Sequence, residues 1–212
     1  MKNKKLNLGM AALVASMIMV GCGTTDTEKP DTPETNQEGT TTEGTIASGK
    51  LTTAYEAVKT AMGEDYLPSM LNEDPELING LYGLDTSLCE AFIVETPMIG
   101  MHPDLFIGVE AKDGQADAVE TALNTYKENL LNDTMQYPMN LPKIAAIDVL
   151  RVDNYVFLAL MGYSGEVAAE AEVADPYAIT EEEEAKINEE ITAASKELTQ
   201  KALTAAKEAL TK

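Results

Sequence analysis

The chain has 212 residues, and its 36 acidic residues against 15 lysines and arginines give a formal net charge of −21 at pH 7. So negative a charge repels nucleic-acid phosphates and anionic lipid headgroups, which excludes both as electrostatic partners. Apolar residues make up 44% of the sequence, enough for the core of one ordinary domain flanked by tails.

The first residues have the features of an export signal that ends at a cysteine. Three lysines precede an apolar stretch of about 15 residues, which is shorter than the roughly 20 that a helix needs to cross a bilayer. Met19-Val20-Gly21-Cys22 then matches a lipobox, the site where bacterial lipoproteins are acylated and cut. We therefore expect residues 1–21 to be removed as a lipoprotein signal peptide and Cys22 to carry fatty acids such as palmitate.

Residues 22–50 have the composition of a disordered tether behind the lipidated cysteine. Segment 23–50 holds nine threonines and six acidic residues, and Ile46 is its only bulky apolar residue. Such a segment cannot bury enough apolar surface to offset the cost of ordering it. Because two acyl chains suffice for stable attachment, we expect a protein anchored by lipid on the extracytoplasmic face of the cell membrane.

Helical patterns open the segment 51–163, for which we predict one α+β domain. Leu51, Tyr55, Val58 and Met62 recur at helical spacing, so a first helix should end near Gly63. A second, short helix should follow: Asp74-Pro75-Glu76 has an N-cap acid followed by proline, and Gly83 provides a stop.

The rest of the domain reads as strands around one helix. Residues 91–96 are β-branched and aromatic, and Leu105, Ile107, Val109 and Ala111 alternate with residues expected to face out. An amphipathic helix is predicted over 115–132 and a loop over 133–143. The runs 144–152 and 155–161, joined by Asp153-Asn154, predict a β-hairpin whose second strand is interior, since it is apolar on both faces. We therefore predict an α+β fold with a four-stranded, mainly antiparallel sheet (β-β-α-β-β) and helices on one face.

Residues 164–212 should form an acidic helical tail rich in alanine and glutamate. Thr180 and Glu183 fit a capping box at the start of a long C-terminal helix. Its apolar stripe is thin: Ile187, Ile191, Ala194, Leu198, Ala202, Ala205 and Ala209. Three alternatives remain open for this helix, which can dock on its own domain, pair with a helix of a protein partner, or stand free.

A few residues merit examination for chemistry, each beside a plainer interpretation. Cys89 has no partner for a disulfide once Cys22 is lipidated, and we read it as a small buried residue. His102 lies in a predicted loop without a second ligand or nucleophile at suitable spacing. Glu95 and Glu110, on adjacent strands, are the one carboxylate pair to test for acid–base or metal chemistry.

Methionines near His102 raise one further alternative. Met98 and Met101 flank the approach to that imidazole, and soft ligands of this kind bind copper(I), although loop methionines packed over a sheet edge are the plainer interpretation. The other methionines considered with them are Met135, Met139 and Met161.

No P-loop, dinucleotide fingerprint, nucleophile elbow or EF-hand loop occurs in the sequence. We thus expect no enzyme, catalytic residue, cofactor or metal centre. The expected function is a non-enzymatic interaction module at the cell surface; the alternative is a small solute- or metal-binding lipoprotein.

The order of these motifs resembles exported bacterial lipoproteins that carry domain of unknown function 4358. The resemblance covers about 51–162 and rests on Tyr82-Gly83-Leu84-Asp85, on 91–98, on the run 104–114 that leads into the long helix, and on the hairpin at 153–158. It implies no activity, because none defines the family. With lysine outnumbering arginine 14 to 1, it favours a Gram-positive source. The acidic tail departs from the family pattern.

Overall fold

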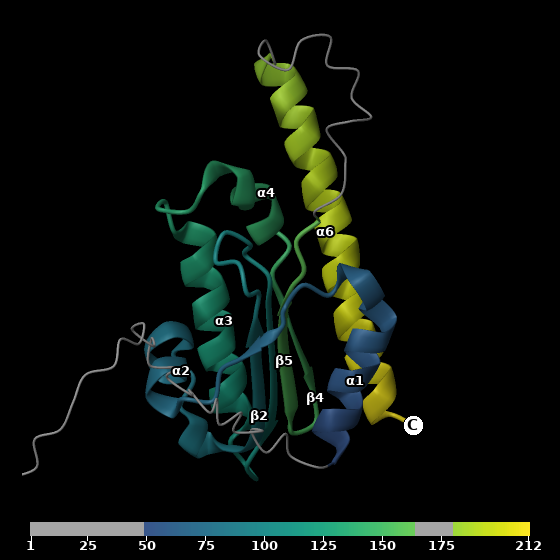
Figure 1. Ribbon diagram of the computed structural model, residues 1–212. Coiled ribbons are helices and arrows are strands. Elements are labelled where there is room, and N and C mark those ends of the chain that lie inside the picture. The colour runs from purple at the N-terminus through teal and green to yellow at the C-terminus, as the bar shows by residue number, and fades with distance from the viewer. Residues whose placement is uncertain (1–48, 164–179) are drawn as a thin grey trace, which may run out of the picture. The chain divides into compact units, whose positions relative to one another are not determined.

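The computed structural model describes residues 49–163 and 180–212. The expected signal peptide, the lipidation site Cys22, all but the end of the expected tether and residues 164–179 lie outside these ranges. The described residues form an antiparallel sheet with helices on both of its faces (Figure 1). The predicted α+β class is therefore confirmed, but two details of the predicted architecture are wrong.

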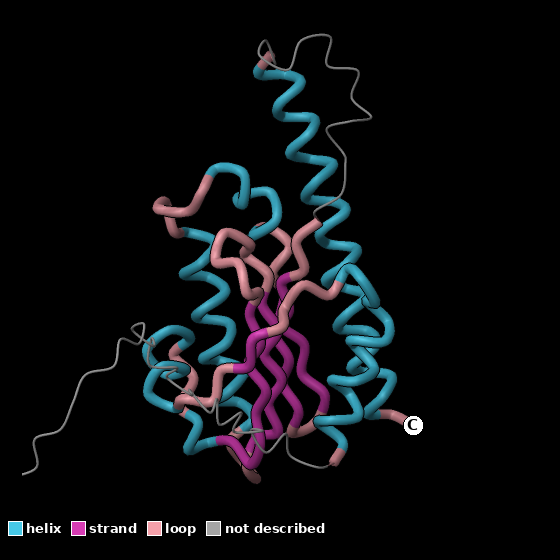
Figure 2. Tube along the Cα trace, viewed as in Figure 1, coloured by secondary structure: helices cyan, strands magenta, loops and turns pink. Residues whose placement is uncertain are grey.

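The first correction is the number of strands, which is five. The strands are β1 (Met70–Leu71), β2 (Cys89–Thr96), β3 (Leu105–Ala111), β4 (Asp148–Val152) and β5 (Tyr155–Leu160), in the spatial order β1-β2-β3-β5-β4 (Figure 2). All neighbours pair antiparallel. β1 has only two residues, too few to show an alternating pattern in the sequence. The predicted interior position of β5 is confirmed, because it pairs with both β3 and β4.

The helices are α1 (Lys50–Met62), α2 (Pro75–Tyr82), α3 (Ala116–Asn132), α4 (Leu141–Ile144) and α6 (Glu181–Leu210). The predicted caps of α2 are confirmed: the Asp74 carboxylate accepts hydrogen bonds from the backbone N–H groups of Glu76 and Leu77, and Gly83 takes the left-handed conformation. The Thr180–Glu183 capping box is also present. The predicted loop 133–143 includes most of α4, so Ile144 ends a helix and does not begin a strand.

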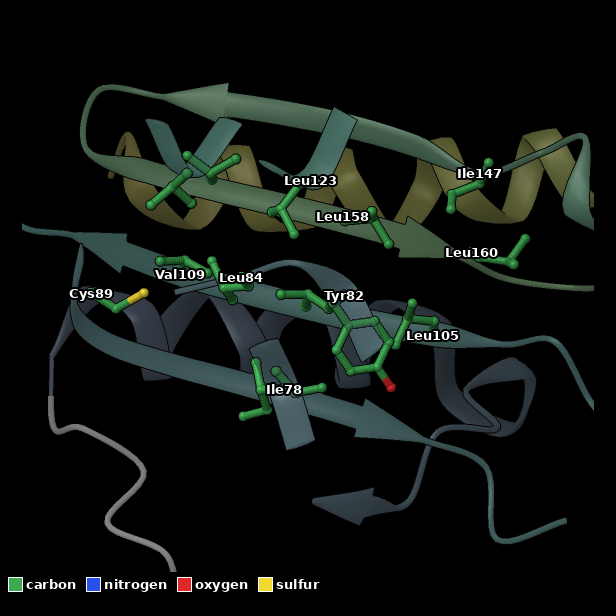
Figure 3. Packing of buried hydrophobic residues seen from close by; sticks show 14 of the residues in the cluster. Ile78, Tyr82, Leu84, Cys89, Leu105, Val109, Leu123, Ile147, Leu158 and Leu160 are labelled. Carbon is green, nitrogen blue, oxygen red and sulfur yellow. The ribbon is translucent and has the colours of Figure 1, made fainter. Parts of the chain in front are cut away.

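One face of the sheet packs against α2 and α3. Its core includes Ile78 and Tyr82 from α2, Leu123 from α3 and Leu158 from β5, all of which point into one apolar layer (Figure 3). This is the layer that the alternation in β3 predicts, since Ile107 and Val109 lie in it and are fully buried. The predicted helix–sheet packing is thus present on this face.

The second correction is that the opposite face is also covered, by α1 and α6 (Figure 1). Phe106 of β3 and Phe157 of β5 are fully buried there, so β3 is not the half-buried strand that its alternation predicts. Gly108 lets α1 approach closely: a Cβ atom at this position would lie 3.2 Å from Cδ1 of Leu51. The glycine, which reads as an outward position in the sequence, is a contact point beneath a helix.

Of the three alternatives for α6, the structure shows docking on its own domain. Two backbone N–H groups just after β5 donate hydrogen bonds to side chains of α6. Met161 N donates to Thr199 Oγ1 (3.1 Å), and Tyr163 N donates to Ser195 Oγ (2.9 Å). The fully buried residues of α6 are Ser195, Thr199, Ala202, Leu203, Ala206 and Leu210, of which only Ala202 belongs to the predicted stripe. Leu198, Ala205 and Ala209 of the stripe are partly buried and pack against the same core, so the predicted face is confirmed in part. Residues 181–186 are all exposed. None of the described helices is long and apolar enough to cross a membrane.

Candidate functional site

The short turns and the longer loops that connect the strands and helices lie at opposite ends of the sheet. The start of α1, the turn after β3 and the β4–β5 turn lie near the C-terminal end of α6 (Figure 1). The other end carries the β2–β3 loop and the α3–α4 connection. We call residues 97–104 and 133–141 together the loop end.

The loop end concentrates exposed apolar side chains. Seven of the twelve large hydrophobic residues that are exposed in the described ranges lie there, and Met98 and Met135 expose 75% and 88% of their surface. The seven are Met98, Ile99, Met101, Met135, Tyr137, Met139 and Leu141. Single exposed apolar residues are common, but several of them gathered on the loops at one end of a domain are typical of interaction surfaces.

A buried hydrogen bond joins the two loops of this surface. Asn140 is 6% exposed, and its Nδ2 donates to the backbone oxygen of Met101 at 2.9 Å. The β2–β3 loop also has an internal bond from His102 N to Ile99 O (3.1 Å). The side chain of Asn140 therefore ties the two loops that carry the exposed methionines to each other.

A buried carboxyl group lies directly beneath the loop end. Asp104 is 2% exposed; its Oδ1 accepts a hydrogen bond from Gly162 N (2.8 Å), while its Oδ2 has no partner among the described residues. Burial raises the pKa of this carboxyl, and His102 and Lys143 oppose that shift. Asp104 fastens the start of β3 to the end of β5, next to the loop that it supports.

Two adjoining hollows lie beside the loop end. One, of about 240 Å³, is lined by Thr96, Pro97, His102 and Asp104 together with Tyr82 and Tyr126. The second, of about 430 Å³, lies between α2 and α3 and shares both tyrosines, whose rings meet edge to face at 5.2 Å. Oδ2 of Asp104 is itself enclosed, so a solute in the smaller hollow would not reach it.

The structure separates the carboxylate pair that the sequence suggested. Glu95 pairs across the sheet with Phe106, and Glu110 pairs with Ala91, so the two carboxylates are not opposite each other. Each accepts a tyrosine hydroxyl instead: Tyr66 donates to Glu95 at 2.6 Å and Tyr155 donates to Glu110 at 2.9 Å. The hypothesis of a shared acid–base or metal site at this pair is wrong. Within residues 49–163 and 180–212, no cluster of three or more His, Cys, Asp or Glu residues has the geometry to hold a metal ion.

Cys89 and His102 lie at opposite ends of β2. Cys89 begins the strand and is buried, as predicted; burial raises the pKa of its thiol to about 11. His102 is half-buried in the loop that follows the strand, near the exposed Met98 and Met101. A thiol–imidazole pair is therefore not formed, while the imidazole and the two thioethers do share one loop.

Sequence reasoning identified His102 and the methionines but missed Asp104 and Asn140. The loop 133–141 carried one available signal, since a solvated loop seldom holds two methionines, a tyrosine and a leucine. The hydrogen bond between Asn140 and Met101 joins positions 39 residues apart, so no local sequence pattern predicts it.

The described residues thus define an α+β domain in which helices cover both faces of a five-stranded antiparallel sheet, with an apolar loop surface at one end. Residues 62–161 match the family model described as Domain of unknown function (DUF4358), which supports the resemblance seen in the sequence for this domain. The match runs from the end of α1 to just past β5 and omits α6. Searches of curated proteins and of solved structures each gave no match.

Proposed function

We propose that this protein is a lipid-anchored, non-enzymatic interaction module on the extracytoplasmic face of the cell membrane, with the loop end as its contact surface. The observation that carries the proposal is the group of seven exposed apolar residues in the two segments of the loop end, which the side chain of Asn140 ties together. The export signal and lipobox at Cys22 supply the anchor.

The direction of α1 supports this arrangement. The chain that follows Cys22 enters the domain at Lys50, at the end of the sheet opposite the loops (Figure 1). A domain tethered through that end can present the loop end away from the membrane.

Anchoring is tested by metabolic labelling with a fatty acid in the producing bacterium. We expect label on the wild-type chain and on Cys89→Ser, and none on Cys22→Ser, which should also keep its signal peptide. Cys89→Ser is the matched control, since it removes the other thiol of the chain. Label on the Cys22→Ser chain would contradict the lipid site.

Partner binding is tested by cross-linking in intact cells followed by mass spectrometry. The informative variant is Met98→Ser with Met139→Ser, and the matched control is Leu77→Ser with Leu81→Ser, which changes two exposed apolar residues on α2. We expect one recurring neighbour that is lost with the first double variant and kept with the second. Equal recovery with both, or no recurring neighbour at all, would count against the loop end as the contact surface.

A small solute-binding lipoprotein is the second candidate, and the paired hollows at Tyr82 and Tyr126 are the observation that favours it. The larger, about 430 Å³, falls in the size range of small-molecule sites, roughly 300–1,000 Å³. A thermal-shift screen with solutes and metal ions, repeated on Tyr126→Ala, tests it. Stabilisation that disappears in the variant would support this function over the first.

A further inference from the structure

The loop end adjoins an acidic extension of α6. Thr192 Oγ1 donates a hydrogen bond to the backbone oxygen of Pro142 at 3.0 Å, which fixes the middle of α6 against α4. The turns before Thr192 project beyond α4 (Figure 1). The exposed glutamates there are Glu181, Glu182, Glu183, Glu184, Glu189 and Glu190.

Few cations lie on the N-terminal turns of α6 and on the loop end. Lys186 is the one cation in residues 180–192, and it lies 3.8 Å from Glu190. The two loops of the loop end contain no lysine or arginine. Lys143, in α4, lies near the buried Asp104, and His102 is the one titratable base on the two loops. Negative charge therefore predominates beside the apolar surface, and a complementary partner would bring positive charge with its apolar groups.

Resting on the function proposed above, we infer that the loop end binds a basic amphipathic helix of a partner protein. The apolar face of that helix would lie on Met98, Met101, Met139 and their neighbours, and its lysines or arginines would face the glutamates of α6. Unbranched thioether side chains adapt to apolar helix faces of varied shape, which is why methionine is abundant at such surfaces.

The same features argue against two other occupants. A second copy of this chain would bring two acidic extensions together, and like charges repel. A bilayer rich in anionic lipid would also be repelled, and it would meet this surface only if the domain turned its tethered end away. The edge strand nearest the loop end is β1, which pairs with the last residues of β2 and has only two residues. So short an edge offers few backbone groups to an added strand. A helix thus suits the surface better than a strand.

The test measures binding of a fluorescein-labelled, 18-residue leucine–lysine peptide with an amphipathic helical pattern to the full chain, by fluorescence anisotropy. A peptide of the same composition in scrambled order controls for charge alone. We expect binding at least about tenfold tighter for the amphipathic peptide, weakening about tenfold between 50 and 500 mM NaCl.

Substitutions test whether the peptide binds the methionines of the loop end and the glutamates of α6. Met98→Ser with Met139→Ser should weaken binding about tenfold or more, and Glu182→Gln with Glu184→Gln about threefold at low salt. Leu77→Ser with Leu81→Ser should bind as the wild type does. Circular dichroism of each variant verifies folding, and should one methionine variant unfold, Ile99→Ser replaces it.

Three results would overturn the inference: equal affinity for the scrambled peptide, indifference to the methionine substitutions, or concentration-dependent dimers by light scattering that occupy the loop end. Its failure is distinct from failure of the proposed function. Cross-links lost with the methionine variant but no peptide binding would keep the interaction module and reject the helix. Peptide binding without fatty-acid label on Cys22 would keep the helix-binding surface and reject the lipid anchor.

Discussion

The hydroxyl of Tyr66 donates a hydrogen bond of 2.6 Å to Oε2 of Glu95, which joins the segment after α1 to strand β2. Glu95 is 4% exposed and lies beside the ring of Phe106, with which it pairs across the strands. Burial and the bond to this carboxylate hold the pKa of the Tyr66 hydroxyl far above its ordinary value. The hydroxyl is therefore protonated, and able to donate this bond, at neutral pH.

We predict that Tyr66→Phe lowers the free energy of unfolding by about 1.5–3 kcal/mol, as expected when a buried charged acceptor loses its donor. The matched control is Tyr155→Phe, which removes the bond to Glu110 at a more exposed position. That change should cost less than about 1 kcal/mol. Urea denaturation of both variants is the measurement, and equal losses would show that burial of Glu95 does not strengthen its bond.

Two glycines should respond to alanine in opposite directions. At Gly108 a Cβ atom would meet Leu51, Phe106 and Phe157 at 3.2–3.4 Å, so Gly108→Ala should destabilise the protein by about 1–3 kcal/mol through overpacking. Gly80 lies within α2 with open space around it, so Gly80→Ala should stabilise by about 0.5–1 kcal/mol. Thermal unfolding of both variants checks the signs; a neutral Gly108→Ala would mean that α1 is free to shift outward.

Asp104 should make stability depend on pH. Its pKa in the folded protein is above the ordinary 3.8, so the native state holds this proton more tightly than the unfolded chain does. This group therefore lowers the free energy of unfolding as pH rises from about 4 through the raised pKa, and the loss is complete above it. Asp104→Asn removes the titration, so its stability relative to the wild type should improve between pH 4 and pH 7.

The measurement for Asp104 is urea denaturation of wild type and variant across that pH window, with Asp65→Asn as an exposed control. Other carboxyls affect both chains alike, so only the difference between the curves matters. A difference that stays flat with pH would show that Lys143 or His102 fully compensates the buried charge.

Cys89 should react slowly with alkylating agents while the protein is folded. A thiol with a pKa raised from 9.0 to about 11 has about a hundredfold less thiolate at pH 7. Iodoacetamide labelling of the Cys22→Ser chain, followed by mass spectrometry, should speed up at least about hundredfold in denaturing urea. In the native protein the rate should still rise tenfold per pH unit between pH 9 and 10; a plateau near pH 9 would contradict the raised pKa.

Local signals predicted the elements that local chemistry determines. α2 follows from Asp74 as N-cap and Gly83 as stop, and the β4–β5 hairpin follows from Asp153-Asn154 between apolar runs. The start of α6 follows from the Thr180–Glu183 capping box. Each of these signals acts within a few residues, which is the range that a sequence pattern reports.

Features that depend on distant parts of the chain were missed. β1 exists because Met70 and Leu71 meet the end of β2, and two residues carry no periodicity of their own. The covered second face depends on Gly108, which lets α1 approach the sheet, and on small residues of α6 that pack on the same face. In the site, the sequence indicated His102 and nearby methionines, but the buried partners Asp104 and Asn140 act through Gly162 and Met101.

The packing of α1 against α6 has a kinetic consequence. These helices are the first and last elements of the described fold, and together they bury Phe106 and Phe157. Contacts so far apart in sequence are entropically expensive to form early, so this face should close late and slowly during folding. A chain that ended before Ala202 would leave the sheet face around Phe106 and Phe157 without its α6 cover. Chaperones and proteases act on apolar surfaces that are exposed in this way.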